Sequence, residues 1–223
     1  IYHPLSILTL RYIRQTARIF TPTGSPMKST NIFETHSRIT KELRAERLGH
    51  KGGVLWLTGL SGAGKSTLAT ALEHRLFQNG YNVYVLDGDN VRHGLSSNLA
   101  FSPEDRAENI RRVGEVCGLF ADAGFVTIAA FISPYRNDRT IARHASGGGF
   151  HEVFVNADLA TCEARDTKGL YKRARQGEIL DFTGISAPYE EPLNAELQVD
   201  TMNRDIESCL DILEDYVEKN FKQ

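Results

Sequence analysis

Apolar runs alternate with helical patterns along the chain after residue 52. Val54 to Thr58 is a short apolar run, and a glycine-rich turn follows it. The next stretch, Lys65 to Gln78, places Leu68, Leu72 and Leu76 at helical spacing. This order predicts a strand, a loop and a helix.

The same alternation continues toward the C-terminus. Strands separated by helix-length patterns are typical of a parallel sheet covered by helices. The sequence therefore predicts an α/β fold with a mainly parallel sheet and helices on both faces. The further expected strands are Asn82 to Leu86, Phe125 to Ile132, Glu152 to Val155 and Leu193 to Val199, and a closing amphipathic helix is expected over Arg204 to Asn220.

A long helix is predicted from Pro103 to about Ala123. Ser102 can cap its start, Pro103 suits the first helical position, and Asp105 lies in the first turn. Gly124 is expected to end it. The inward stripe of this helix is Ile110, Val113, Cys117 and Phe120.

Composition narrows the class of protein. The chain has 223 residues, with 26 Lys and Arg against 28 Asp and Glu, which is typical of one soluble globular domain. A nearly neutral charge gives no reason to expect nucleic-acid binding, and no apolar run is long enough to span a membrane. Cys117, Cys162 and Cys209 lack disulfide or zinc spacing, so we expect reduced, buried thiols and a cytoplasmic protein.

The first part of the chain differs from the rest. Residues 1–33 contain Arg11, Arg14, Arg18 and Lys28 but no acidic residue, which resembles an organellar transit peptide. Residues 1–26 are equally well explained as added sequence or as the remnant of an upstream domain. If they are a transit peptide, the location is a plastid or mitochondrion. We expect an N-terminal extension and polar arm over 1–50, in part disordered, and one domain over 51–223.

The strongest motif is a phosphate-binding loop between the first strand and the first helix. Its backbone N–H groups can surround phosphate oxygens, Lys65 can neutralise the β and γ phosphates, and the Ser66 hydroxyl can bind Mg²⁺. A chance match has a probability of roughly one in a hundred. The motif predicts nucleoside triphosphate binding without choosing among kinase, GTPase and motor. The expected ATP residues are Gly59, Leu60, Ser61, Gly62, Ala63, Gly64, Lys65, Ser66 and Thr67.

Two carboxylates follow the second predicted strand. Asp87 ends it and Asp89 comes two residues later, at the sheet edge where ligands bind in open α/β folds. We assign Asp87, together with Ser66, to Mg²⁺, and Asp89 to the proton of an attacking alcohol. The alternative, an ordinary turn, is weakened by the neighbouring phosphate loop.

Basic and polar side chains beyond these carboxylates predict an acceptor site. Arg92 follows them directly, while Arg106 and Asn109 share one face of the long helix. Ile132 and Ser133 lie where a strand ends. Ser133 is expected either to bond a substrate phosphate or to form a covalent intermediate, and the absence of a nearby base in sequence favours the first role.

The segment 165–175 carries five basic residues and one acidic residue. This local excess of positive charge predicts a lid facing an anion, with Arg165 and Lys168 as its main cations. Phe101 and Phe182 offer faces on which a base could stack, although for each ring taken alone the sequence favours core packing.

The assembled motifs resemble the adenylylsulfate kinase (APS kinase) family, from about Lys51 to Pro192. They are GLSGAGKST, LDGDNVRHGL, FSPEDRAENIRRVGEV, FADAG, FISPYR, CEARD, KGLYKRAR and FTGI. The resemblance implies a three-layer P-loop kinase fold, with a lid at about 165–190, that uses ATP and Mg²⁺. The implied reaction phosphorylates the 3′-hydroxyl of adenosine 5′-phosphosulfate (APS) to give 3′-phosphoadenylyl sulfate (PAPS) and ADP.

The resemblance also implies site residues and partners. It makes Ser133 the family's proposed phosphoserine position, and it implies a homodimer and a functional link to ATP sulfurylase, without nucleic acid or membrane partners. Thr167 and Ser186 depart from the usual residues of the lid, which affects the expected closing rate more than activity. The implied APS residues are Asp89, Arg92, Phe101, Arg106, Asn109, Ile132, Ser133, Lys168 and Phe182.

Two rival functions remain open at this stage. One is a kinase for another small alcohol, such as a nucleoside or a sugar acid. The other is a nucleotide-binding regulatory module without transferase activity, which would bind ATP but form no PAPS. The presence of Asp87, Asp89 and Arg106 favours an enzyme over the second rival.

Overall fold

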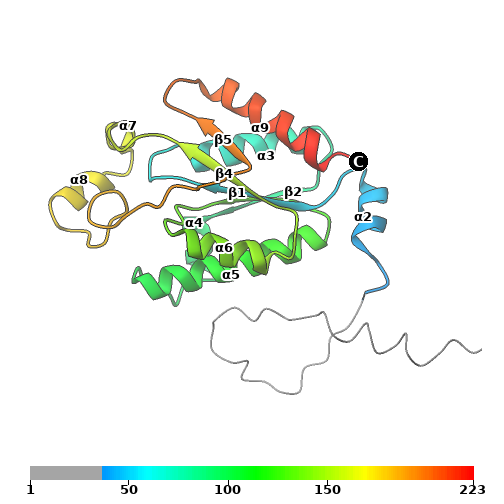
Figure 1. Cartoon of the computed structure of the whole chain (residues 1–223), viewed down its shortest axis with the longest axis horizontal. Helices are drawn as coiled ribbons and strands as arrows, with labels where there is room; N and C mark the ends of the chain where they lie inside the picture. The colour runs from blue at the N-terminus through cyan, green and yellow to red at the C-terminus, as the bar shows by residue number, and fades with distance from the viewer. Residues whose placement is uncertain (1–36) are drawn as a thin grey trace, which may run out of the picture. The chain divides into compact units, whose positions relative to one another are not determined.

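Five parallel strands form one sheet within residues 37–223, the part of the chain that this computed structural model describes (Figure 1). The expectations for residues 1–26 lie outside these residues. The spatial order of the strands is β2-β3-β1-β4-β5, and all four pairings are parallel. The strands are β1 Gly53–Thr58, β2 Val83–Asp87, β3 Val126–Ala130, β4 Phe150–Asn156 and β5 Leu197–Asp200.

Helices cover both faces of the sheet (Figure 1), so the predicted α/β class is confirmed. Alternate residues of β1 point to opposite sides: Leu55 and Leu57 pack with α3 and α9, whereas Val54 and Trp56 pack with α5 and α6. The helices are α2 Lys41–Leu48, α3 Lys65–Gln78, α4 Gly88–His93, α5 Pro103–Asp122, α6 Arg136–Ala145, α7 Leu159–Arg165, α8 Leu170–Arg175 and α9 Ile206–Phe221.

Two segments differ from the sequence prediction. The residues after Asp87 form the short helix α4 in place of a simple turn, because the Asp87 carboxylate caps it by accepting the N–H of Asp89. The last strand begins at Leu197, four residues later than expected. A six-residue helix and a four-residue strand are too short for hydrophobic periodicity to define.

Helix α5 begins as its sequence indicates and packs unusually close to α6. The Ser102 side chain accepts the N–H of Asp105, and Pro103 opens the helix. A Cβ added at Gly114 would lie 2.7 Å from the Cα of Ala142. Glycine is therefore required there by the close contact between α5 and the C-terminal half of α6.

Helix α2 lies within the expected polar arm and joins the domain through its C-terminal end. His50, which follows it, is buried, and its Nε2 accepts the backbone N–H of Asn82 at 3.0 Å. None of the helices in residues 37–223 combines the length and apolar composition that crossing a bilayer requires. All three cysteines are buried and free, as the sequence predicts.

Candidate active site

The phosphate loop lies between the carboxyl end of β1 and the start of α3. Gly62 and Gly64 have φ angles of +79° and +99°, which favour glycine, and a Cβ at Gly62 would lie 2.8 Å from the carbonyl oxygen of Cys162. Gly64 is the N-cap of α3, a helix of 14 residues. The loop therefore presents backbone N–H groups and the positive end of a helix dipole at one place.

Lys65 is buried inside this loop, with 8% of its surface exposed. Its ammonium group donates to the carbonyl oxygens of Gly59 at 3.0 Å and Leu60 at 2.7 Å. Burial lowers the pKa of Lys65 from 10.5 to about 8, because carbonyl dipoles only partly replace the lost hydration. A bound triphosphate would give this cation the negative partner that it lacks here.

Ser66 and Asp87, the two predicted metal ligands, are in direct contact. The Ser66 hydroxyl donates to Asp87 Oδ2 at 2.7 Å. Within residues 37–223 no group of three or more His, Cys, Asp or Glu side chains could hold a metal. Two hard oxygen donors beside a phosphate loop nevertheless fit Mg²⁺, which commonly completes its shell with phosphate oxygens and water.

Asp89 pairs with Lys168 across the site. Lys168 Nζ lies 2.5 Å from Asp89 Oδ2, although 79 residues separate them in the chain. The carboxylate raises the pKa of Lys168 chiefly through this hydrogen bond. Both side chains are more than 60% exposed, so the pair contributes little to stability. Its importance is positional, because it brings Lys168, from the segment expected to form a lid, into contact with the predicted catalytic carboxylate.

Arg92, Phe101 and Arg106 gather beside this pair. The Arg92 guanidinium lies over the Phe101 ring, 4.3 Å from the ring centroid, while Phe101 remains 63% exposed. Arg106 Nε donates to the carbonyl of Phe101, and its Nη2 donates to the carbonyl of Asp181, each at 2.8 Å. Arg106 therefore connects the start of α5 to the end of the lid.

Two other predicted acceptor residues are less accessible. Asn109 is buried, and its Oδ1 has no hydrogen-bond partner within residues 37–223. Phe182 is also buried and packs edge to face against Tyr171, with ring centroids 5.0 Å apart. The core-packing role that the sequence left open thus describes the surroundings of Phe182.

Ser133 lies at the carboxyl end of β3 and is only 2% exposed. Its hydroxyl accepts from Trp56 Nε1 at 3.0 Å and donates to Thr58 Oγ1 at 3.1 Å. The carbonyl of Ile132 accepts from the same Thr58 hydroxyl at 2.8 Å. Among the described residues 37–223 no basic side chain bonds the Ser133 hydroxyl, so its surroundings favour a positioning role over a nucleophilic one.

The segment expected to form a lid contacts the phosphate loop through Tyr171, a residue that the sequence reasoning missed. The buried Tyr171 of α8 donates its hydroxyl to the carbonyl of Ser61 at 2.8 Å. Its place one helical turn after Lys168 is the signal that could have found it. Arg165, expected to face an anion, instead donates to the carbonyl of Thr201 at 2.6 Å, and the Thr201 hydroxyl donates to Ala63 at 3.0 Å. Arg165 therefore supports the phosphate loop from behind.

Three further arginines form ion pairs or hydrogen bonds within the protein. Arg173 and Arg175 of the lid pair with Glu178 and Glu163 near the surface. Arg112 of α5 donates to the carbonyl of Leu95 at 3.0 Å, because the loop before α5 folds back onto that helix.

Comparisons with known proteins agree on one family. The sequence model described as adenylylsulphate kinase matches residues 51–200. The adenylyl-sulfate kinase of Staphylococcus carnosus is 54% identical over 193 residues, covering 86% of this chain and 97% of that protein. The enzyme of the same name from Shewanella amazonensis is 58% identical over 187 residues, covering 83% and 94%.

A solved structure agrees with the sequence matches. The Mycobacterium tuberculosis APS kinase CysC, in complex with AMPPNP and APS, superimposes with a TM-score of 0.73 and 46% identity. The match covers 75% of this chain and 98% of that one.

Proposed function

Since the chain belongs to the adenylylsulphate kinase family, we propose that it transfers the γ-phosphate of ATP to the 3′-hydroxyl of adenosine 5′-phosphosulfate. The products are PAPS and ADP, so the protein is a phosphotransferase that acts on an alcohol in sulfate activation. The observation that carries this proposal is the chain of contacts from Ser66 through Asp87 to Asp89 and Lys168. These contacts connect the phosphate loop directly to Asp89 and Lys168, two residues expected to bind the acceptor.

The phosphate loop holds the ATP end of the reaction. Residues 59–67 surround the triphosphate, and Lys65 exchanges its two carbonyl partners for the β and γ phosphate oxygens. Ser66 and Asp87 would hold Mg²⁺, which when bound neutralises charge on those phosphates. The helix dipole of α3 adds to this stabilisation.

Asp89 acts at the acceptor end. Its carboxylate orients the 3′-hydroxyl and accepts its proton as the phosphoryl group arrives, which is general base catalysis. Lys168 supplies positive charge from the lid at the same point. Since Asp89 is already paired with Lys168, the incoming hydroxyl must share or displace that hydrogen bond.

The rest of the acceptor pocket is assigned by the family resemblance and by position. Arg92 and Arg106 provide cations for the phosphosulfate group, and Phe101 offers an exposed ring to the adenine. Ile132 and Ser133 form the pocket floor at the end of β3. Asn109 and Phe182 belong to the pocket wall and are more buried than Arg92, Phe101 and Arg106.

We extend the proposal to the organisation of the protein. Residues 51–223 form the kinase domain, with a lid at about 165–190, and residues 1–50 are an extension. The protein is a cytoplasmic homodimer that receives APS from ATP sulfurylase, or an organellar one if residues 1–26 are a transit peptide. It has no nucleic acid or membrane partner. Light scattering would test the dimer, and N-terminal analysis of the native protein would test the location.

The central experiment follows ADP release with ATP, Mg²⁺ and one candidate acceptor at a time, and identifies the product by mass. We expect turnover with APS and formation of PAPS, with no turnover on gluconate or adenosine. A Lys65→Ala variant serves as the inactive control. Turnover of another alcohol without turnover of APS would refute the acceptor assignment, and ATP binding without any transfer would indicate a regulatory module.

A further inference from the structure

Ser133 has a backbone conformation that residues with side chains rarely adopt. Its φ is +39°, and within residues 37–223 only Asp181 among the other non-glycine residues has a positive φ. Such a conformation persists only where the surrounding structure holds it. The bonds with Trp56 and Thr58 hold the hydroxyl of Ser133, whereas its carbonyl receives from the Thr58 hydroxyl only a long contact of 3.5 Å.

Arg139 of α6 holds that carbonyl. Its Nη1 donates to the Ser133 oxygen at 2.7 Å, and the residue is only 3% exposed. Its other two nitrogens also donate: Nε donates to Glu152 Oε1 at 2.5 Å, and Nη2 donates to the carbonyl of Glu190 at 2.8 Å. A planar guanidinium with three fixed acceptors has no freedom to shift.

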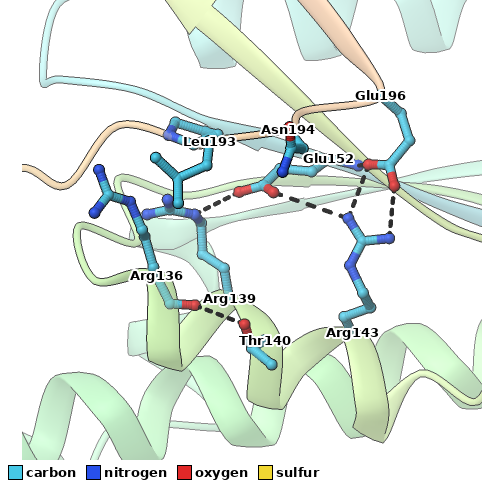
Figure 2. Close-up of a pocket in the computed structure, with 9 residues that line it drawn as sticks. Arg136, Arg139, Thr140, Arg143, Glu152, Leu193, Asn194 and Glu196 are labelled. Atoms are coloured by element: carbon cyan, nitrogen blue, oxygen red, sulfur yellow. Dashed lines mark hydrogen bonds and ion pairs between the residues drawn. The ribbon is translucent and has the colours of Figure 1, made fainter.

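Glu152 of β4 makes this buried cation possible. Figure 2 shows Arg139 and Arg143 reaching Glu152 from the same side of α6. A buried guanidinium without a counter-charge would be strongly destabilising. The Glu152 backbone N–H donates to Glu196 Oε2 at 2.7 Å, which fixes its backbone, and Arg143 Nη2 lies 3.8 Å from its Oε2.

The third partner of Arg139 lies just after the lid. The Glu190 N–H donates to the carbonyl of Pro134 at 2.8 Å, and the Glu190 carboxylate accepts the N–H of Arg136 at 2.9 Å. The neighbouring Tyr189 hydroxyl is 2.9 Å from that of Thr58. The loop of Ser133 and the exit of the lid are therefore fixed to one another through α6.

We propose that Arg139, with Glu152 as its counter-ion, is a positioning residue for the APS site. It touches no substrate. It sets the backbone of Ser133 and the attachment of the lid, and it makes no contact with the phosphate loop, so it acts on APS binding and not on ATP binding. This inference rests on the proposed function, because the acceptor must be the ligand that meets Ser133.

The test compares Arg139→Lys with the matched control Arg143→Gln in steady-state assays that vary APS and ATP separately. Lysine keeps the charge but cannot bond three acceptors in a plane. We expect KM for APS to rise at least about tenfold in Arg139→Lys, with KM for ATP within about twofold of wild type. Arg143 shares Glu152 but bonds neither Ser133 nor Glu190, so its variant should resemble wild type.

Each outcome decides the inference. Equal rises in both KM values, no rise, or the same rise in Arg143→Gln would overturn it. If Arg139→Lys does not fold, Glu152→Gln replaces it, since glutamine keeps the side-chain shape and removes the counter-charge. The same result is then required: a rise in KM for APS without an equal rise in KM for ATP. A wild type that does not use APS would overturn the proposed function, and this inference with it. If the wild type uses APS but the variant shows no selective rise in KM for APS, the inference alone is overturned.

Discussion

The buried Lys65 makes ATP affinity depend on pH in a direction that can be calculated. In the nucleotide-free protein its pKa is lowered from 10.5 to about 8 by burial. A triphosphate favours the charged form, and we expect the pKa of Lys65 to return to at least 10.5 in the complex. Binding above pH 8 therefore takes up a proton, and affinity falls as pH rises.

The magnitude follows from these two pKa values. At pH 7 Lys65 is charged with or without nucleotide, so binding takes up almost no proton. At pH 9 about nine-tenths of the nucleotide-free protein would have to be protonated first, which weakens binding about tenfold. The full difference between the two pKa values corresponds to about 3 kcal/mol.

Isothermal titration with AMPPNP and Mg²⁺ at pH 7, 8 and 9, in two buffers of different ionisation enthalpy, measures both affinity and proton uptake. Lys65→Arg is the control, because its guanidinium stays charged throughout and its Kd should not change over this range. An unchanged wild-type Kd without proton uptake would refute the assigned pKa. An equal slope in Lys65→Arg would show that another group titrates.

Stability of the nucleotide-free protein should change with the opposite sign. Between pH 8 and 10.5 the unfolded chain binds more protons at Lys65 than the folded chain does. The contribution of this residue to the free energy of unfolding therefore rises with pH across that window. Below pH 8 the contribution is constant, because both states are protonated.

Three substitutions test other parts of the structure. Asp89→Asn should keep ATP affinity within about twofold and lower kcat by at least about 100-fold, because the general base is lost; near wild-type turnover would remove Asp89 from its role. Tyr171→Phe removes the bond to a partly buried carbonyl of the phosphate loop, so urea unfolding should report a loss of about 1 kcal/mol in the free energy of unfolding, and no loss would contradict this coupling. Gly114→Ala should lower the free energy of unfolding by about 1–3 kcal/mol, since its Cβ would meet the α6 backbone at 2.7 Å. The control Gly94→Ala, which has open space around it, should change the free energy of unfolding little. Equal unfolding midpoints for these two glycine variants would refute the close helix contact.

Local features of the molecule could be predicted from sequence alone. The phosphate loop was identifiable because its glycines, Lys65 and Ser66 act through the backbone of one short segment between a strand and a helix. The start of α5 was identifiable for the same reason, since Ser102 bonds an N–H only three residues away. The parallel sheet followed from the alternation of apolar runs and helical patterns. Each of these depends on contacts within one segment or on a repeated period.

Burial and partnership were decided only by the tertiary structure. The sequence does not distinguish Phe182 from Phe101, because each is an aromatic residue that could stack on a base or pack in the core. In the structure the Phe182 ring is buried and the Phe101 ring is exposed. Arg112 bonds the carbonyl of Leu95 only because the loop before α5 folds onto that helix, and no spacing in the sequence predicts this contact. The group formed by Ser133, Arg139 and Glu152 joins a strand end, a helix and another strand, and no spacing predicts it. A hydrogen bond or ion pair depends on distance and direction in space, and these are determined only when separate elements pack together.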